Sequence, residues 1–301
     1  MTRTPHHSNS PGSRPDENPQ RNVAFKPGEA DLPMDSTELR VRITTSGLAF
    51  VTLDRPQVHN AFDEAQIERL TMSFEALSAN DTVRVVILRG SGRHFCAGAD
   101  IGWMRRAAQA SEAENLEDAL RFSRMMRAVA DCSKPVIAVV QGAAFGGGMG
   151  LACAADIVIA ADNARFALTE AKFGILPAVI GPYVVNAIGR RHAMELALTC
   201  RALSAPQAQA IGLVQHIVAS ESLDAALLDV LRGLLRNGPA ALREIKKLLG
   251  QLSPQPISDT TISLTARTIA RVRATAEARE GFTAFVDKRD PGWVAEPMLD
   301  Y

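Results

Sequence analysis

The chain has 301 residues, of which 47% are hydrophobic and 22% are charged. A chain of this length can bury a substantial core and form one large domain, with or without a small appendage. Its 33 basic and 33 acidic residues balance at neutral pH, which argues against a nucleic-acid or anionic-membrane partner. No apolar run reaches the about 18 residues of a membrane-spanning helix, so we expect a cytoplasmic protein.

The cysteines stand singly, without a C-x-x-C pair: Cys96, Cys132, Cys153 and Cys200. Such spacing argues against a disulfide framework and against a zinc site. The pair His6-His7 is too short to indicate a metal site, and we assign His59 and His94 a structural role. We therefore predict that the protein holds no metal.

Residues 1–36 are rich in Pro, Ser, Asn and Arg and poor in apolar residues, which predicts a disordered extension. Short apolar runs between turn signals predict strands at 41–44, 48–53, 83–88, 136–140, 157–160 and 165–167. Helical spacing of apolar residues predicts helices at 62–78, 113–131, 193–199, 205–210, 222–236, 239–249 and 257–275, with another ending near 154. We expect residues 102–112 to form a polar loop.

The most informative segment is the triplet Gly146-Gly147-Gly148, which joins the strand at 136–140 to an apolar helix. Glycine lets a backbone approach a ligand closely, and the helix directs unpaired N–H groups and the positive end of its dipole at the turn. Such a turn can hold an anion or an oxygen on which negative charge develops. By itself, the triplet is equally typical of a tight turn that packs a helix on a sheet.

Two further segments add to this turn. Residues 93–101 follow the strand at 83–88 and place small residues after a glycine, Gly98. Residues 166–175 supply a carboxylate, Glu170, among apolar side chains. Taken alone, Glu170 is also typical of a helix start, with Thr169 as the cap. Two backbone donor segments and one glutamate together predict a site that forms an enolate.

In their order along the chain, these segments resemble the enoyl-CoA hydratase/isomerase (crotonase) superfamily over about residues 38–294. The matching segments are 53–56, 60–62, 95–101, 134–142, 146–148, 153–157, 166–174, 208–214 and 280–289. The resemblance implies an α/β fold, with a crotonase-like ββα spiral core at 37–220 and a C-terminal helical trimerisation region at 221–301. It also implies homotrimers, often paired into hexamers, an acyl-CoA substrate, and no cofactor apart from the coenzyme A of the substrate.

In this family the thioester oxygen lies between two backbone N–H donors, which by position correspond to Ala99 and Gly147. They stabilise the enolate, and losing one such donor typically raises the barrier by roughly 3 kcal/mol. Glu170 corresponds to an acid/base glutamate of the family. The resemblance implies that the acyl-CoA contacts Ala97, Ala99, Asp100, Ile101, Gly147, Gly150 and Lys288.

The match departs from the family at Gly150, where many hydratases carry a second glutamate. A mechanism shared between two glutamates therefore cannot be carried over. One carboxyl group close to both reacting carbons suffices for a syn addition, first as base toward water and then as acid toward the α-carbon. We expect the apolar surroundings of Glu170 to favour its neutral form.

Residues 148–151, 166–170 and 176–184 together resemble the branch of 3-methylglutaconyl-CoA and isohexenylglutaconyl-CoA hydratases. Substrates of that branch carry a second carboxylate, which needs a nearby cation because a buried unpaired carboxylate is costly. The candidates are Arg105, Arg106 and Lys172, although each is more typical of a solvated surface charge. Tyr183 is either a hydrogen-bond donor or a core residue, and Phe285 is either an adenine contact or a core residue.

These features favour a hydro-lyase that adds water reversibly to a short or branched α,β-unsaturated acyl-CoA resembling 3-methylglutaconyl-CoA. Two alternatives stay open. One is an enoyl-CoA isomerase, which also moves a proton with a single carboxylate. The other is a CoA-binding oligomer without chemistry, which Gly150 keeps open and which Glu170 and both glycine turns argue against.

Overall fold

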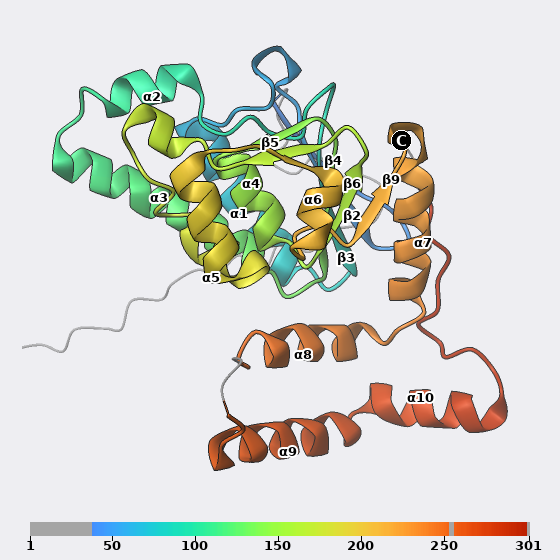
Figure 1. Ribbon diagram of the computed structural model, residues 1–301. Coiled ribbons are helices and arrows are strands. Elements are labelled where there is room, and N and C mark those ends of the chain that lie inside the picture. Colours follow the sequence, from blue (N-terminus) through green and yellow to red (C-terminus); the bar gives the residue numbers. More distant parts are fainter. Residues whose placement is uncertain (1–37, 253–255, 300–301) are drawn as a thin grey trace, which may run out of the picture.

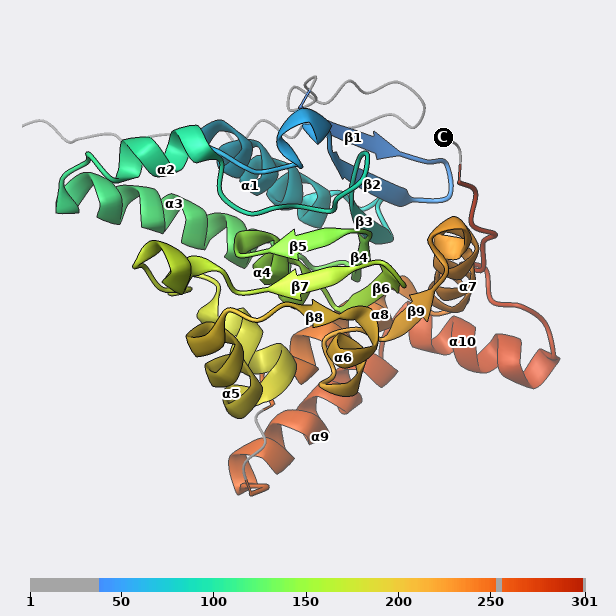
Figure 2. The same cartoon turned by 45° about the horizontal axis from the view of Figure 1, so that its top comes forward.

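The computed structural model describes residues 38–252 and 256–299, so the predicted extension at 1–36 lies outside the described residues. Within the described part, a six-stranded sheet has the order β1-β2-β3-β4-β6-β9 and a three-stranded sheet the order β5-β7-β8 (Figures 1 and 2). The strands are β1 (Leu39–Ile43), β2 (Leu48–Leu53), β3 (Val85–Gly90), β4 (Val136–Val140), β5 (Ala143–Phe145), β6 (Ile157–Ala161), β7 (Arg165–Ala167), β8 (Leu203–Ser204) and β9 (His216–Val218).

Helices surround and extend these sheets. In chain order they are α1 (Glu64–Ala79), α2 (Ile101–Ala107), α3 (Glu112–Ala130), α4 (Gly147–Ala154), α5 (Gly181–Thr199), α6 (Ala205–Ala210), α7 (Leu223–Leu235), α8 (Pro239–Leu249), α9 (Asp259–Arg273) and α10 (Ala276–Asp287). Short 3₁₀ turns are η1 (Pro56–Val58), η2 (Glu170–Phe173) and η3 (Ser220–Ser222).

From β4 to β7, successive strands alternate between the two sheets, and an α-helix follows each pair. Strand β4 lies in the large sheet, β5 in the small one, and α4 comes next; β6 and β7 repeat the step before α5. The strands of the large sheet are parallel except for the antiparallel pair β1–β2. This arrangement confirms the predicted α/β fold with a ββα spiral.

Both faces of the large sheet are buried, because alternate side chains of a strand point to opposite faces. On one face, Leu48 and Phe50 of β2 pack in a cluster with three leucines of α7, which are Leu227, Leu231 and Leu235. On the other face, Ala49 and Val51 join the larger core with side chains of α1, α3 and α4. Burial on both faces is why these strands read as continuous apolar runs rather than alternating ones.

The prediction of a polar loop at 102–112 was wrong where α2 forms. Asp100 begins this helix, since its Oδ1 accepts hydrogen bonds from the N–H groups of Gly102 at 2.7 Å and Trp103 at 3.4 Å. No side chain of α2 is buried, so its sequence lacks the apolar spacing that reveals other helices. Polar contacts, together with the packing of Trp103 against Phe62 and Phe122, therefore hold α2 in place.

Three strands of two or three residues were missed, because so few residues rarely show a pattern, although β7, also of three residues, was predicted at 165–167. The missed strands are β5, β8 and β9. Helix α5 begins well before the predicted 193–199. The sequence did not reveal its first part, because Gly189 has a φ of 75° and interrupts the helical spacing.

Helices α8, α9 and α10 stand apart from the sheets, whereas α7 lies against the large sheet (Figure 1). Within residues 221–252 and 256–299, one helix therefore belongs to the core and three extend from it. The division at 220/221 and the role of this region in trimer formation stay predictions. Among the described helices, none has the length and apolar character to cross a membrane.

Candidate active site

The direction of the Ala99 N–H group is set by the peptide bond between Gly98 and Ala99. The carbonyl of Gly98 accepts a hydrogen bond from the N–H of Phe62 at 2.9 Å, and the N–H of Asp100 donates to the Phe62 carbonyl at 3.0 Å. In a trans peptide the carbonyl and the N–H point in opposite directions, and the described residues contain no cis peptide. The Ala99 N–H therefore points away from Phe62, and no described residue accepts its hydrogen bond.

The N–H group of Gly147, at the start of α4, likewise has no partner within its helix, although Gly147 itself is buried. The Gly146 carbonyl accepts from the N–H of Gly150 at 3.0 Å, so the Gly147 N–H points out of the helix. Gly146 has φ 51° and ψ −122°, a combination that a side chain would strain. As at any helix start, the first N–H groups have no intrahelical partner and carry the positive end of the dipole.

Close packing of backbone brings the two donor segments together. An isolated bridge joins Cys96 to Ala144, and a Cβ on Gly98 would lie 3.6 Å from the Gly147 nitrogen. On the other side, a Cβ on Gly147 would lie 2.3 Å from Cζ of Phe62. Phe62 thus holds the Ala99 segment with its backbone and supports Gly147 with its ring.

Glu170 lies at this junction. Its Oε1 is 3.2 Å from the point that a Cβ on Gly146 would occupy, and its Oε2 is buried without a hydrogen-bond partner. Glu170 is the first residue of η2, but the Thr169 side chain makes no capping hydrogen bond. The structure therefore brings Glu170 beside the Gly146–Gly147 peptide, with one carboxylate oxygen buried and without a hydrogen-bond partner.

Burial raises the pKa of Glu170 above its ordinary value of 4.5, while hydrogen bonds from the backbone of Glu170 and Thr169 act in the opposite direction. The direction agrees with the expectation from the sequence. Of the apolar neighbours along the chain, Phe166 and Leu168 are buried, but Phe173 and Ile175 are exposed. A raised pKa suits a group that must both take up and release a proton near neutral pH.

The space beside Gly150 is already filled. A Cβ on this residue would lie 2.4 Å from Cγ2 of Ile180 and 3.4 Å from Cε of Met126. A glutamate at 150 would therefore require Ile180 to move. The second carboxylate of many family members is replaced here by apolar packing, and Gly150 itself is buried.

The other predicted ligand contacts are only partly gathered. Ala97 and Asp100 are half-buried in the Ala99 segment, and Ile101 follows with 68% of its surface exposed. Lys288 ends α10, which both overall views place away from α4 (Figures 1 and 2). Tyr183 packs against the core, and burial raises its pKa.

A large cavity lies elsewhere, at the opposite end of β5. Its volume is about 710 Å³, and its lining includes Arg93, His94, Gly142 and Arg165 but none of the three predicted catalytic residues. His94 has a structural role there, because its Nδ1 accepts a hydrogen bond from the N–H of Ala143 at 3.0 Å. No cluster of metal-ligating side chains occurs within residues 38–252 and 256–299.

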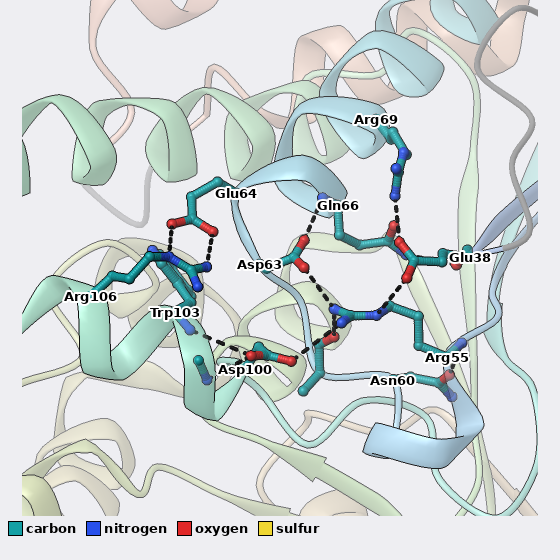
Figure 3. A network of polar contacts seen from close by, with 12 residues as sticks. Glu38, Arg55, Asn60, Asp63, Glu64, Gln66, Arg69, Asp100, Trp103 and Arg106 are labelled. Atoms are coloured by element: carbon teal, nitrogen blue, oxygen red, sulfur yellow. Dashed lines mark hydrogen bonds and ion pairs between the residues drawn. The ribbon is translucent and has the colours of Figure 1, made fainter.

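Several residues around the site could not be found from the sequence. The rings of Phe62, Trp103 and Phe122 form a cluster, with centroids 5.3 to 6.0 Å apart, and Phe122 also faces Gly147. Arg55, noted only as part of a matching segment, is buried beneath the Ala99 segment in a network of carboxylates (Figure 3). Phe62 and Arg55 each lie in a segment that matches the family, but that signal did not indicate what either side chain contacts.

Residues 44–296 match the family model described as enoyl-CoA hydratase/isomerase. The chain belongs to this family. It is 34% identical to a carnitinyl-CoA dehydratase of Salmonella arizonae, over 84% of this chain and 97% of the relative. It is 33% identical to the 1,2-epoxyphenylacetyl-CoA isomerase of Escherichia coli, over 81% and 94%.

The fold is also that of solved structures of the family. An enoyl-CoA hydratase from Shewanella pealeana superposes with a TM-score of 0.82 at 39% identity, covering 85% of this chain and 96% of that structure. Members of the hydratase/isomerase family are therefore similar to this chain in sequence and in structure, and they include both hydro-lyases and isomerases.

Gly147→Ala should abolish most activity while the protein stays folded. Its Cβ would meet the Phe62 ring at 2.3 Å, so the Gly147 N–H must shift away from the reacting oxygen. Loss of one such donor typically costs about 3 kcal/mol, or a hundredfold in kcat. Steady-state kinetics on an enoyl-CoA would measure the loss.

Gly233→Ala is the matched control, because a Cβ at this position on α7 meets nothing within 4 Å. Alanine favours a helix over glycine by about 1 kcal/mol, so this variant should keep its activity and gain stability. Unchanged activity in Gly147→Ala would contradict the assignment of the donor.

Glu170→Gln should change stability in a pH-dependent way. Because burial raises the pKa of Glu170 above 4.5, the folded state binds more protons than the unfolded state between these two pKa values. The stability that the wild type has at low pH is lost as pH rises through that window. The variant should therefore melt at the same temperature as wild type at pH 4 and at a higher temperature than wild type at pH 8. Thermal unfolding at both pH values tests this.

Proposed function

We propose that this protein is an enoyl-CoA hydratase that adds water reversibly across the C2=C3 bond of a short or branched α,β-unsaturated acyl-CoA. The observation that carries this proposal is the carboxylate of Glu170, which is half-buried beside the Gly146–Gly147 peptide with Oε2 unpaired. A buried carboxylate oxygen without a partner is costly. It is expected where a ligand completes its hydrogen bonding.

The proposed chemistry uses one carboxylate and two backbone donors. The thioester oxygen accepts hydrogen bonds from the N–H groups of Ala99 and Gly147 and gains negative charge as the enolate forms. Glu170 takes a proton from water while the water oxygen bonds to C3, and then returns a proton to C2. Both new bonds form on the face of the substrate where Glu170 lies, so the addition is syn.

The side chain of Ile180 supports the one-carboxylate form of this mechanism. It fills the place beside Gly150 where a second glutamate would begin, so Glu170 has to serve both carbons. The same observation favours the second candidate, an enoyl-CoA isomerase, because an apolar wall offers nothing to hold a water molecule. In that reaction Glu170 would carry a proton between C2 and C4 of a β,γ-unsaturated thioester.

For the acyl group, we propose a glutaconyl-type substrate with a second carboxylate, such as 3-methylglutaconyl-CoA. Among the candidate cations, Arg106 is engaged by Glu64, with Nη2 to Oε2 at 2.6 Å. Arg105 and Lys172 are exposed, and Lys172 lies two residues after Glu170 on η2. We therefore favour Lys172 as the group that meets the distal carboxylate, while Ile101 and Asp100 contact the CoA portion.

Loss of the ultraviolet absorbance of the conjugated thioester tests the function directly. Wild type should hydrate 3-methylglutaconyl-CoA faster than crotonyl-CoA, and Glu170→Gln should lose both activities by more than about a hundredfold because its carboxylate is the only acid/base. Lys172→Ala should raise the KM for the dicarboxylic substrate alone.

Turnover of crotonyl-CoA alone would contradict the glutaconyl-type substrate and leave a hydratase of simple acyl chains. If neither substrate is consumed but 3-hexenoyl-CoA gains conjugated absorbance, the protein is an isomerase. Binding of these thioesters without any turnover would favour the non-catalytic alternative.

We also propose that protomers associate as homotrimers or paired trimers, in a cytoplasmic enzyme. Large apolar side chains are exposed on α10, where Phe285 is 85% and Val286 is 76% exposed; burial against a neighbour would remove them from water. Lys288 would then approach the CoA of a neighbouring protomer. The four cysteines are free, as in a reducing compartment.

Charged side chains introduced at the exposed apolar positions of α10 should prevent the association of protomers. Phe285→Glu combined with Val286→Asp is expected to shift the mass measured by light scattering to that of one chain, 32.3 kDa, because the charges cannot be buried unpaired. Met72→Asp, which changes an exposed apolar residue on α1, is the control and should leave the measured mass unchanged. A wild type of 32.3 kDa would contradict the proposal.

A further inference from the structure

Arg55 is the centre of a charged network just behind the Ala99 segment (Figure 3). Only 9% of its surface is exposed. Its guanidinium faces three carboxylates from separate parts of the chain, with Asp63 Oδ2 at 3.2 Å, Asp100 Oδ2 at 3.3 Å and Glu38 Oε1 at 3.5 Å. An arginine fork can engage several acceptors in fixed directions, which a lysine cannot do.

Two of these carboxylates also begin helices. Asp63 Oδ1 accepts from the N–H of Gln66 at 2.9 Å at the start of α1, and Asp100 Oδ1 accepts from the N–H of Gly102 at 2.7 Å at the start of α2. Each aspartate therefore uses one oxygen for its helix and the other for Arg55. The guanidinium consequently fixes the starts of α1 and α2 relative to each other.

Arg55 also holds both strands of the short ladder that directs the Ala99 N–H. Its Nη1 donates to the Ala61 carbonyl at 2.9 Å, immediately before Phe62, and its Nη2 donates to Asp100, immediately after Ala99. The ladder itself consists of the Phe62 hydrogen bonds to Gly98 and Asp100. A shift of either strand would turn the Gly98–Ala99 peptide and its N–H.

The position of Arg55 is itself fixed by its backbone. Its N–H donates to Asn60 Oδ1 at 2.9 Å, and its carbonyl accepts from the N–H of Asn60 at 2.9 Å. The amide of Asn60 donates in turn to the carbonyls of Ser91 and His94 at 2.9 and 2.8 Å. The network thus ties Arg55 to the segment that leads from β3 into the Ala99 loop.

We propose that Arg55 is a positioning residue for the enolate-stabilising N–H of Ala99, an inference that rests on the proposed function. Arg55 acts through Asp100 and the Ala61 carbonyl and needs no contact with the substrate. Its charge also prevents three carboxylates from facing one another uncompensated, since a buried charge that loses its partner destabilises a protein strongly. Position and stability therefore depend on the same side chain, and an experiment must separate them.

Three variants separate position from stability. Arg55→Lys keeps the positive charge but loses the fork. Asp100→Asn and Asp63→Asn each remove one charge that faces Arg55 at almost the same distance, and asparagine still caps a helix. Because only Asp100 adjoins Ala99, Asp63→Asn is the matched control, and thermal unfolding should show similar losses of stability in the two asparagine variants.

The first readout is exchange of the α-protons of butyryl-CoA with D2O, which needs the enolate but no addition of water. Arg55→Lys and Asp100→Asn should slow the exchange by about ten- to a hundredfold, as displacing a group by about 1 Å does, whereas Asp63→Asn should slow it by less than about threefold. The effect should lie in kcat, with KM nearly unchanged in Arg55→Lys.

The second readout is the carbonyl stretching frequency of bound crotonyl-CoA labelled with ¹³C at the thioester carbon. Two N–H donors lower this frequency, and the lowering should shrink in Arg55→Lys and Asp100→Asn but not in Asp63→Asn. Equal responses in all three variants, or none in Arg55→Lys, would overturn the positioning role. If wild type binds the thioester without any turnover, the proposed function fails, and the carbonyl frequency still decides the role of Arg55.

Discussion

Three backbone segments approach one another at this site more closely than side chains would permit, and the rest of the arrangement depends on that approach. A Cβ on Gly148 would lie 2.2 Å from the Cys96 carbonyl, and one on Gly147 would lie 2.3 Å from the Phe62 ring. Because the donors belong to the main chain of packed segments, they are already oriented before any ligand arrives. Such preorganised dipoles stabilise developing charge without the cost of reorganising at the moment of reaction.

The same apolar packing determines the character of the carboxylate. Burial raises the pKa of Glu170 and leaves one of its oxygens without a partner. Ile180 occupies the space beside Gly150, so the surroundings of Glu170 hold no second carboxylate from position 150. Low polarity favours the neutral form of the carboxyl and strengthens hydrogen bonds from nearby N–H groups. A single glutamate can therefore be both a usable acid and a usable base.

Charged residues help to orient α2 and the Ala99 segment, whereas apolar packing positions most other elements. Helix α2 has no fully buried side chain, although Trp103 packs against Phe62 and Phe122. Its start is held by Asp100 and Arg55, while Arg106 pairs with Glu64 on α1. Ion pairs with fixed hydrogen-bond directions define orientation more sharply than apolar contacts, even where their net contribution to stability is small. The Ala99 segment thus lies between an apolar layer on the Phe62 and Gly147 side and a charged layer on the Arg55 side.

By itself, the sequence determined the longer strands and β7, most helices, the two glycine turns and the position of Glu170, because each has a local pattern or lies in a segment that resembles the family. Only the tertiary structure decided that Ile180 fills the place of a second glutamate, and that Glu38, Arg55, Asp63 and Asp100 meet. These residues come from segments far apart along the chain, and none shows a periodicity. Local sequence determines which backbone groups are free to bind, whereas packing between distant segments determines which of them face one another.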